Sequence, residues 1–346
     1  MIVRLPRGVS AALAAAALFG ASTPLAKVLL EGADPRLLAG LLYLGAGLGL
    51  ALLRAAHRRA RVRLPRAEAG WLAGAVLAGG VLAPVLLLTG LARLPASGAS
   101  LLLNAEVVLT AVIAWVAFRE NVDARVALGL VAITAGALVL SWPDGPATVG
   151  DPWPSLMVLG ACLLWATDNN LTRQVSTVDA TWVAMVKGLV AGSVNLALGL
   201  GSGAPWPTVG VVASALVVGF AAYGASLALF VVALRELGTA RTGAYFSVAP
   251  FVGAGLAVAL GDDLSVRLGL AGVLMAAGVW LHLSERHAHE HTHPRLTHDH
   301  WHTHDDGHHE HEHRTQVAGR HRHPHLHEPA THSHLHHPDV HHRHTH

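Results

Sequence analysis

The sequence predicts an all-α membrane protein with ten transmembrane helices, built as two inverted five-helix repeats and followed by a disordered, histidine-rich tail. Three observations predict this fold. First, 52% of the residues are hydrophobic and only 13% are charged, whereas a soluble protein carries about a quarter charged residues. Second, apolar blocks long enough to cross a membrane follow one another over residues 9–283. Third, the remaining residues, 284–346, are almost entirely polar.

The N-terminal segment resembles a signal peptide, because Arg4 and Arg7 precede an apolar run that ends in small residues. The apolar run nevertheless continues to Leu30, past any cleavage site of that kind, and further apolar blocks follow. We therefore interpret this segment as the first transmembrane helix.

Nine further segments also approach the length needed to cross the bilayer, which is about 20 residues at 1.5 Å per residue. Short connections rich in Pro, Gly or charge separate them, as in residues 141–154 and 201–207. The ten predicted spans are residues 9–30, 37–54, 69–90, 96–118, 125–142, 154–174, 181–200, 208–233, 240–260 and 266–283.

The Lys and Arg residues of the short loops predict the orientation, because such residues accumulate on the cytoplasmic side. With a cytoplasmic N-terminus, fourteen of them fall inside and four outside. The inner set is Arg4, Arg7, Arg54, Arg58, Arg59, Arg61, Arg63, Arg66, Arg119, Arg125, Arg173, Arg235, Arg241 and Arg286. The outer set is Lys27, Arg36, Arg93 and Arg267. The sequence thus predicts a bacterial-type inner-membrane protein with both termini in the cytoplasm.

An internal repeat decides the predicted architecture. LFGASTPLAK (18–27) resembles LWATDNNLTR (164–173), and FRENVDARVALGL (118–130) resembles LGDDLSVRLGLAG (260–272). The offsets of 146 and 142 residues span five helices, an odd number, so the second copy must cross the membrane in the opposite sense. Inverted repeats are typical of secondary transporters, whose solute sites lie between the two halves. We expect repeats over 8–142 and 154–283, and a separate tail over 284–346.

These segments resemble the EamA branch of the drug/metabolite transporter superfamily. The resemblance rests on FGASTPLAK in span one, on LPASGASLLLNAEVVLTAVIAWVAFRE around span four and on LGTARTGAYFSVAPFVGAGLAVALGDD around span nine. It implies ten helices in two inverted repeats around a central cavity, and transport, frequently export, of metabolites or amino-acid-like solutes. The chain departs from the pattern at Glu106, where the first repeat often has Pro; Pro250 holds the matching place in span nine.

Ionisable and amide side chains inside the spans are candidates for the solute pathway, because they cost several kcal/mol in hydrocarbon unless paired or hydrated. Glu106 lies near the middle of span four, and is interpreted either as a neutral carboxyl that serves packing or as a cavity wall or proton-responsive group. Asp168 and Lys187 lie at matching depth in neighbouring spans, so we expect an ion pair that either staples the helices or contacts the solute. The amides Asn104, Asn169 and Asn170 accompany these groups.

Four residues near span ends or breaks complete the candidates. Lys27 and Arg173 lie near helix ends, where long side chains reach water, so they either anchor the helix or contact the solute. Pro84 and Pro250 fall within spans, and we expect each to kink its helix and free carbonyl groups for a cavity.

Two GxxxG pairs predict close helix packing, because glycine lets two backbones approach each other. The pairs are Gly70 with Gly74 and Gly188 with Gly192.

The tail holds 24 of the 26 histidines between residues 287 and 346. Such a polar segment cannot bury a core, so we expect it to be disordered. Neutral imidazole binds Zn²⁺, Ni²⁺, Co²⁺ or Cu²⁺, so the tail is a candidate metal-binding segment, although no metal cofactor is required by the pattern. The candidate ligands are His287, His289, His291, His293, His298, His300, His302, His304, His308, His309, His311 and His313.

Two functions compete for this sequence. The first is a secondary transporter of a small polar metabolite, and the second is a transition-metal exporter whose tail collects ions. The spans contain few His or Asp ligands, which favours the first. No Ser/His pair lies in the spans and no Gly-rich ATP-binding loop occurs, so an enzyme and an ATP-driven pump are disfavoured. The expected partners are a small-molecule substrate and the lipid bilayer, without nucleic acid; no oligomeric state is indicated.

Overall fold

The protein is represented by a computed structural model. It divides into two compact units, Met1–Ser284 and Glu285–His346, each of which is described by itself. The residues that the structure describes are 7–58, 62, 64–118, 124–141, 152–173, 175, 179–237, 242, 245–283, 288–293, 296–302, 321–327 and 330–335.

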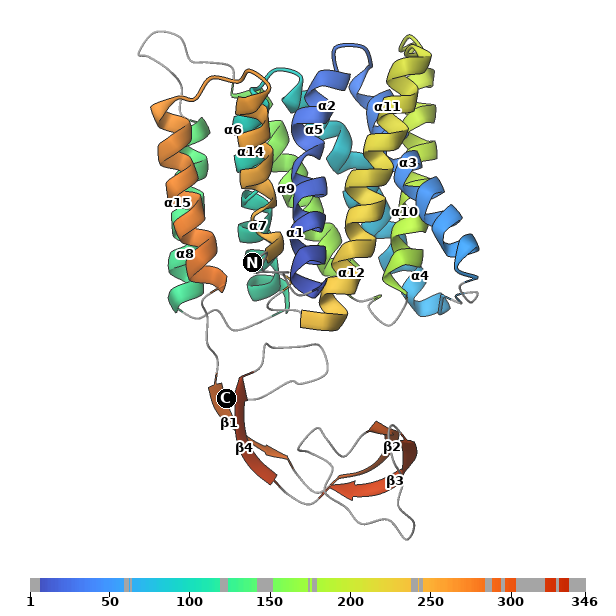
Figure 1. The fold of residues 1–346 in the computed structure, drawn as a ribbon, viewed down its shortest axis with the longest axis vertical. Helices are drawn as coiled ribbons and strands as arrows, with labels where there is room; N and C mark the ends of the chain where they lie inside the picture. The colour runs from blue at the N-terminus through green and yellow to red at the C-terminus, as the bar shows by residue number, and fades with distance from the viewer. Residues whose placement is uncertain are drawn as a thin grey trace, which may run out of the picture. The chain divides into compact units, whose positions relative to one another are not determined.

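The first half of the membrane unit forms five spans, three of which are interrupted (Figure 1). A seven-residue π-helical segment, η1, lies inside span three. In order, the spans are α1 (Arg7–Gly20) with α2 (Ser22–Leu29), α3 (Pro35–Ala56), α4 (Arg66–Ala75) with η1 (Val76–Leu82) and α5 (Ala83–Leu91), α6 (Ala96–Leu102) with α7 (Ala105–Phe118), and α8 (Ala124–Ser141).

The second half repeats this order. Its spans are α9 (Trp153–Arg173), α10 (Ala180–Gly201), α11 (Val209–Gly219) with η2 (Phe220–Ala225) and α12 (Ser226–Leu237), the span that contains α14 (Ala249–Ala259), and α15 (Val266–Leu283). Six helices of the described residues are long and apolar enough to cross a membrane, and shorter apolar helices complete the bundle. The predicted all-helical membrane fold is confirmed.

The interruptions occur at equivalent positions of the two halves. The π-helical segments begin at Val76 and Phe220, 144 residues apart. The turns that break spans four and nine, at residues 103–104 and 247–248, show the same offset. Pro250 lies in the first turn of α14, after the break of span nine, where its missing N–H costs no helical hydrogen bond. Pro84 follows η1 inside the continuous helix of span three, where its missing N–H leaves carbonyl groups of η1 without a helical donor. The duplication thus includes the positions at which the helices are interrupted.

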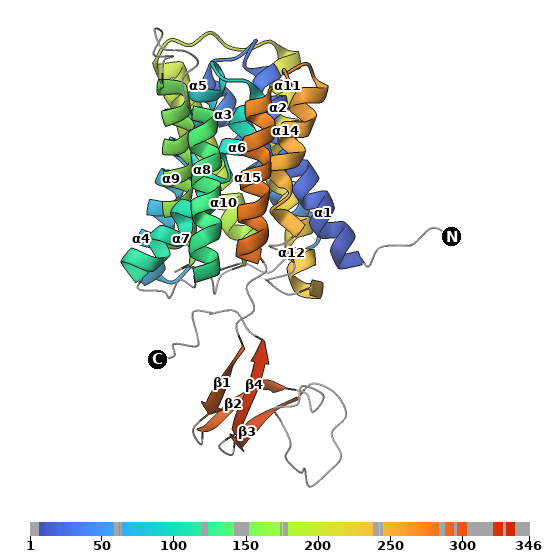
Figure 2. The same ribbon diagram turned by 90° about the vertical axis from the view of Figure 1, so that its left-hand side faces the viewer.

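Spans two, four and five each pack on the equivalent span of the other half. Span one packs on span eight, and span three packs on span six, which are again equivalent contacts. Helix α3 packs on α10, α8 on α15, and α6 on α14; α1 packs on α12, while α9 packs on α5. Figures 1 and 2 show α8 and α15 side by side at one edge of the bundle. This pattern is that of a twofold axis relating the halves.

The two halves run in opposite directions. The Lys27 ammonium at the end of span one donates hydrogen bonds to the carbonyls of Leu91 and Ala92 at the end of span three, at 2.7 and 3.0 Å. Gly90, beside them, lies against the carbonyl of Pro154, where span six begins. Span one therefore ends on the side where span six starts. We call this side the Lys27 end of the bundle.

The opposite side, the Arg54 end, joins the two halves through an ion pair. Arg54 Nη1 lies 2.9 Å from Asp179 Oδ1 and 2.7 Å from Thr181 Oγ1. Asp179 also caps the first turn of α10 by accepting a hydrogen bond from the backbone N–H of Trp182.

One predicted glycine pair mediates close packing and the other does so only in part. A side chain at Gly188 would meet the backbone nitrogen of Gly47 at 2.7 Å, and one at Gly192 would meet the carbonyl of Gly40 at 3.0 Å. Gly74 lies near the side chain of Leu171, but Gly70 has open space around it. The prediction is therefore confirmed for the α3–α10 contact and wrong for Gly70.

Four segments of the tail form antiparallel strand pairs, which corrects the prediction of disorder for these residues. Strand β1 (Ala288–His293) pairs with β4 (Ala330–Leu335), and β2 (Leu296–His302) with β3 (His321–His327). Histidine alternates with other residues in these segments, and this period of two is that of a strand. The strands contain His289, His291, His293, His298, His300 and His302. The candidates His287, His304, His308, His309, His311 and His313 lie outside the described residues.

Candidate functional site

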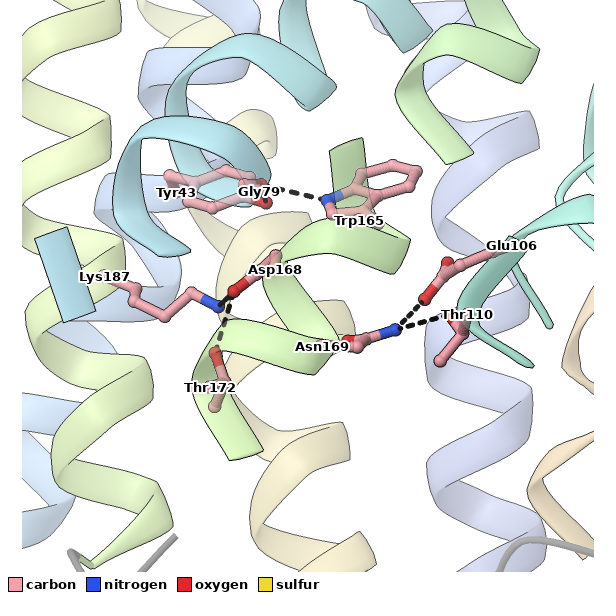
Figure 3. A network of polar contacts seen from close by, with 9 residues as sticks. All are labelled: Tyr43, Gly79, Glu106, Thr110, Trp165, Asp168, Asn169, Thr172 and Lys187. Carbon is pink, nitrogen blue, oxygen red and sulfur yellow. Dashed lines mark hydrogen bonds and ion pairs between the residues drawn. The ribbon is translucent and has the colours of Figure 1, made fainter. Parts of the chain in front are cut away.

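The centre of the site is a buried ion pair between the first two spans of the second half (Figure 3). Lys187 Nζ of α10 lies 2.6 Å from Oδ1 and 2.5 Å from Oδ2 of Asp168 on α9. Thr172, one turn further along α9, donates a hydrogen bond to Asp168 Oδ1 at 2.8 Å. Asp168 is only 5% exposed. The contact predicted between Asp168 and Lys187 is confirmed.

Glycine in η1 makes room for this pair and supplies acceptors beside it. A π-helical segment disturbs the α-helical pattern of backbone hydrogen bonds. The carbonyl of Gly79 accepts hydrogen bonds from Tyr43 Oη at 2.8 Å and Trp165 Nε1 at 2.9 Å. A side chain at Gly79 would collide with Asp168 Oδ2. Only glycine therefore fits between span three and the ion pair.

The neighbouring carbonyl, that of Gly80, accepts a hydrogen bond from Asn195 Nδ2 of α10 at 3.1 Å. Asn195 is fully buried, and this contact matches the interhelical role expected for an amide inside a span. Side chains from spans two, six and seven thus meet at two successive peptide groups of span three.

Glu106 forms a second polar contact on the other side of α9 (Figure 3). It lies in the first turn of α7, directly after the break of span four. Its Oε1 accepts a hydrogen bond from Asn169 Nδ2 at 2.8 Å, and the same amide lies 3.4 Å from Thr110 Oγ1. Glu106 is half-buried, whereas Asn169 is exposed. We call Glu106, Asn169, Asp168 and Lys187 the polar corner.

Two of the predicted amides serve packing rather than this corner. Asn170 is buried and donates to the carbonyl of Ala166 on its own helix at 2.8 Å. Asn104 is 2% exposed, donates to the carbonyl of Leu101 at 2.9 Å and lies 3.8 Å from the sulfur of Met275. Both side chains satisfy hydrogen bonds inside the helix bundle.

The predicted residues near span ends lie apart from the polar corner. Lys27 binds the last carbonyls of span three, where a cation is favoured by the helix dipole. Pro250 begins α14. Arg173 ends α9, and its side chain lies outside the described residues.

Several contributors were absent from the predicted site. Tyr43 and Trp165 were overlooked because their hydrogen-bond acceptor is a backbone carbonyl. No pattern of residues identifies Tyr or Trp as donors to such a group. Thr172 follows Asp168 by four residues and Thr110 follows Glu106 by four, so helical spacing could have identified both.

Chemically, the corner offers two carboxylates, one ammonium and one exposed amide, a set suited to binding a polar or charged solute. Among the described residues of the membrane unit, no three His, Cys, Asp or Glu side chains are grouped so that they could hold a metal ion.

Comparison with protein families decides the relationship. The model of the EamA-like transporter family matches residues 6–142 and again residues 152–284. This chain belongs to the EamA-like transporter family. An uncharacterized transporter of Methanothermobacter thermautotrophicus is 30% identical to it over 284 residues, covering 76% of this chain and 82% of that protein.

A crystal structure of a protein with 18% sequence identity has the same fold, with a TM-score of 0.60 over 79% of this chain and 95% of that one. The family and the relative both indicate that this EamA-like protein is a membrane transporter of a small molecule rather than an enzyme.

Proposed function

We propose that this EamA-like transporter is a secondary transporter that exports a small polar or amino-acid-like solute by alternating access. The observation that supports the proposal is the polar corner, which joins helices of both halves: Glu106 belongs to the first half, whereas Asp168, Asn169 and Lys187 belong to the second. Transporters with inverted repeats bind solutes between the halves and move one half against the other.

The basic residues of the loops support an orientation in the membrane. Arg54, Arg58 and Arg66 all lie at the Arg54 end of the bundle, near the connection between spans two and three. Because basic loop residues accumulate on the cytoplasmic side, we assign this end to the cytoplasm of an inner membrane. The even number of spans then places both termini there.

The tail supports a second candidate, export of a transition metal. In the pairing of β2 with β3, His298, His300 and His302 stand opposite His325, His323 and His321. The tail holds 24 of the 26 histidines of the chain, and imidazole nitrogens are ligands that Zn²⁺ and Ni²⁺ prefer. The described membrane spans lack a comparable group of ligands, so metal binding is proposed for the tail and organic solute transport for the bundle.

Cells that carry the full-length protein, a truncation to residues 1–285 or neither distinguish the two functions. Intracellular and extracellular metabolites are compared by mass spectrometry, and growth is measured over a range of Zn²⁺, Ni²⁺, Co²⁺ and Cu²⁺ concentrations. We expect both forms of the protein to lower the cellular level of the same polar metabolites.

Three other results would be decisive. If the full-length protein protects cells against a metal and the truncated protein does not, the second candidate, metal export, would be supported instead. Unchanged metabolites in the presence of both forms would overturn the proposed organic export. Identical growth in metal with and without the tail would leave the tail without a role in metal handling.

A further inference from the structure

The charges of the polar corner do not balance. It contains two carboxylates, Glu106 and Asp168, and one ammonium group, Lys187. Lys187 contacts both oxygens of Asp168, and Thr172 adds a hydrogen bond to the same carboxylate. Glu106 receives a hydrogen bond from the amide of Asn169, which carries no charge. Within the described part of the chain, no Lys or Arg forms an ion pair with Glu106.

The other titratable side chains around Glu106 do not supply the missing positive charge. They are Asp168 and Cys162 on α9, Lys187 on α10 and Tyr43 on α3. Helix α8 also packs on α7, and its described side chains, 127–140, include no ionisable group. Lys187 is the single cation of this set, and its contacts are with Asp168. An ionised Glu106 at this depth therefore requires a cation from outside the protein.

The accessibility of the corner indicates where that cation would arrive. Asn169 is exposed, although Asp168 and Asn170 on either side of it are buried. Amide side chains inside spans face the bundle interior or water rather than lipid. We therefore expect the edge formed by Glu106 and Asn169 to face water, with the Asp168–Lys187 pair on the other side of α9.

We infer that Glu106 is an exchange site, which holds a proton when the transporter is empty and the ammonium group of an amine-bearing solute when it is loaded. In the exchange, the O–H bond of the Glu106 carboxyl breaks and its proton passes to water. The resulting carboxylate accepts hydrogen bonds from the ammonium group, so one positive charge replaces another and no redox step occurs. The inference rests on the proposed function and names its substrate class, small primary amines.

The protonation of Glu106 can be tested without knowing the solute. Infrared difference spectra of the purified full-length protein are recorded in a titration across the neutral pH range. We expect a protonated-carboxyl band in the wild type and in Glu31→Gln, whose residue is an exposed carboxylate outside the spans, and no such band in Glu106→Gln. A wild-type spectrum without this band at every pH would overturn the inference.

The exchange is tested with methylammonium, L-alanine amide and putrescine, each compared with its N-acetyl derivative. Addition of an amine should remove the Glu106 band and release one proton per bound amine, detected with a pH-sensitive dye in weak buffer. The acetylated compounds should do neither. The inference is overturned if all three amines leave the band unchanged, or if Glu106→Gln releases protons as the wild type does.

Two controls distinguish a failure of the exchange from a failure of folding or of transport. Gln at position 106 keeps an acceptor for Asn169, so we expect the same melting temperature for the variant; if it does not fold, Glu106→Asp, which should shift the carboxyl band, provides the comparison. Metabolite export that is unaffected by pH and by Glu106→Gln would refute the exchange and leave the transporter intact. Proton release by amines without any export in cells would refute the transporter and leave the binding site.

Discussion

The two halves of the bundle share their backbone but differ in the side chains at their meeting point. At the 144-residue offset that relates the π-helical segments, Lys187 corresponds to Tyr43, Gly79 to Tyr223, and Glu106 to Pro250. One side of the seam is therefore charged and the other is aromatic. The duplication fixed the helix path, while each copy acquired its own chemistry.

The aromatic side consists of Phe19, Tyr223, Phe230 and Phe246, which we call the aromatic corner. The ring of Phe19 lies 5.8 Å from that of Tyr223 and 5.4 Å from that of Phe246, and Phe230 lies 4.9 Å from Phe246. Tyr43 connects the two corners, because its ring stacks on that of Tyr223 with the centroids 5.8 Å apart and its hydroxyl donates to the Gly79 carbonyl beside the polar corner.

The largest effect is expected from breaking the ion pair of the polar corner. Lys187→Met leaves the Asp168 carboxylate buried without a countercharge, which costs about 3–5 kcal/mol. Asp168→Asn should be damaging for the converse reason, and the double variant should recover much of the loss. Thermal unfolding in detergent measures all three; additive losses would argue against a direct interaction.

The second largest effect is expected at Gly79, which lies beside the polar corner and corresponds to Tyr223 of the aromatic corner. Gly79→Ala would place a methyl group against Asp168, so we expect a loss of about 1–3 kcal/mol from overpacking. Gly255→Ala is the matched control, because the space around Gly255 is open. Equal stability of the two variants in thermal unfolding would show that α9 can move away from span three.

The third effect concerns the link between the corners. Tyr43→Phe and Trp165→Phe each remove one donor to the Gly79 carbonyl and leave the other, so each should cost about 1 kcal/mol. The double variant leaves that buried carbonyl without either donor, and its loss should exceed the sum of the single losses. A strictly additive result would show that water replaces the missing donors.

The smallest effect compares the caps of two equivalent helices. Asp34 caps α3 and binds Arg36 in the same turn, whereas Asp179 caps α10 and binds Arg54 of the other half. Burial opposes ionisation of Asp179, but hydrogen bonds from Thr181, Trp182 and Arg54 lower its pKa to about 2. Because this pKa lies below the value of about 3.9 for an unfolded chain, the stabilisation is present above about pH 4 and disappears as the pH falls towards 2.

Asp179→Asn should therefore cost about 1 kcal/mol or less at neutral pH, and this difference from the wild type should vanish in acid. Asp34→Asn is the matched comparison, and should cost less because its ion pair lies within one turn. Melting temperatures recorded as a function of pH measure both. A larger loss for Asp34→Asn would mean that the Arg54 end contributes little to joining the halves.

The sequence was sufficient for the parts of this structure that follow from periodicity and burial cost. Hydropathy gave the ten spans, and the repeat offset gave their inversion. Because an unpaired charge inside a span costs several kcal/mol, Asp168 and Lys187 could be predicted to pair. The same reasoning selected Glu106, and Asn169 was also predicted, but the contact between the two became visible only from the packing of α9 on α7.

The remaining features depend on backbone geometry that side chains do not encode in a simple pattern. Nothing in VLAGGVL marks it as π-helical. Pro84, which follows Gly80 by four residues, predicted free carbonyl groups in this span, but the sequence did not show which side chains would bond to them. Pro250 correctly signalled a break in span nine, but the break lies just before it, at residues 247–248. In the tail, composition predicted disorder, whereas the alternation of histidine with other residues accommodates strand pairing.

The segment η1 links span three to three neighbouring helices. Through Gly79 and Gly80, one short stretch of span three is fastened to α3, α9 and α10 by three side-chain hydrogen bonds. Because α9 and α10 belong to the second half and span three to the first, a movement of one half against the other would have to break or exchange the bonds from Trp165 and Asn195 at these two peptide groups.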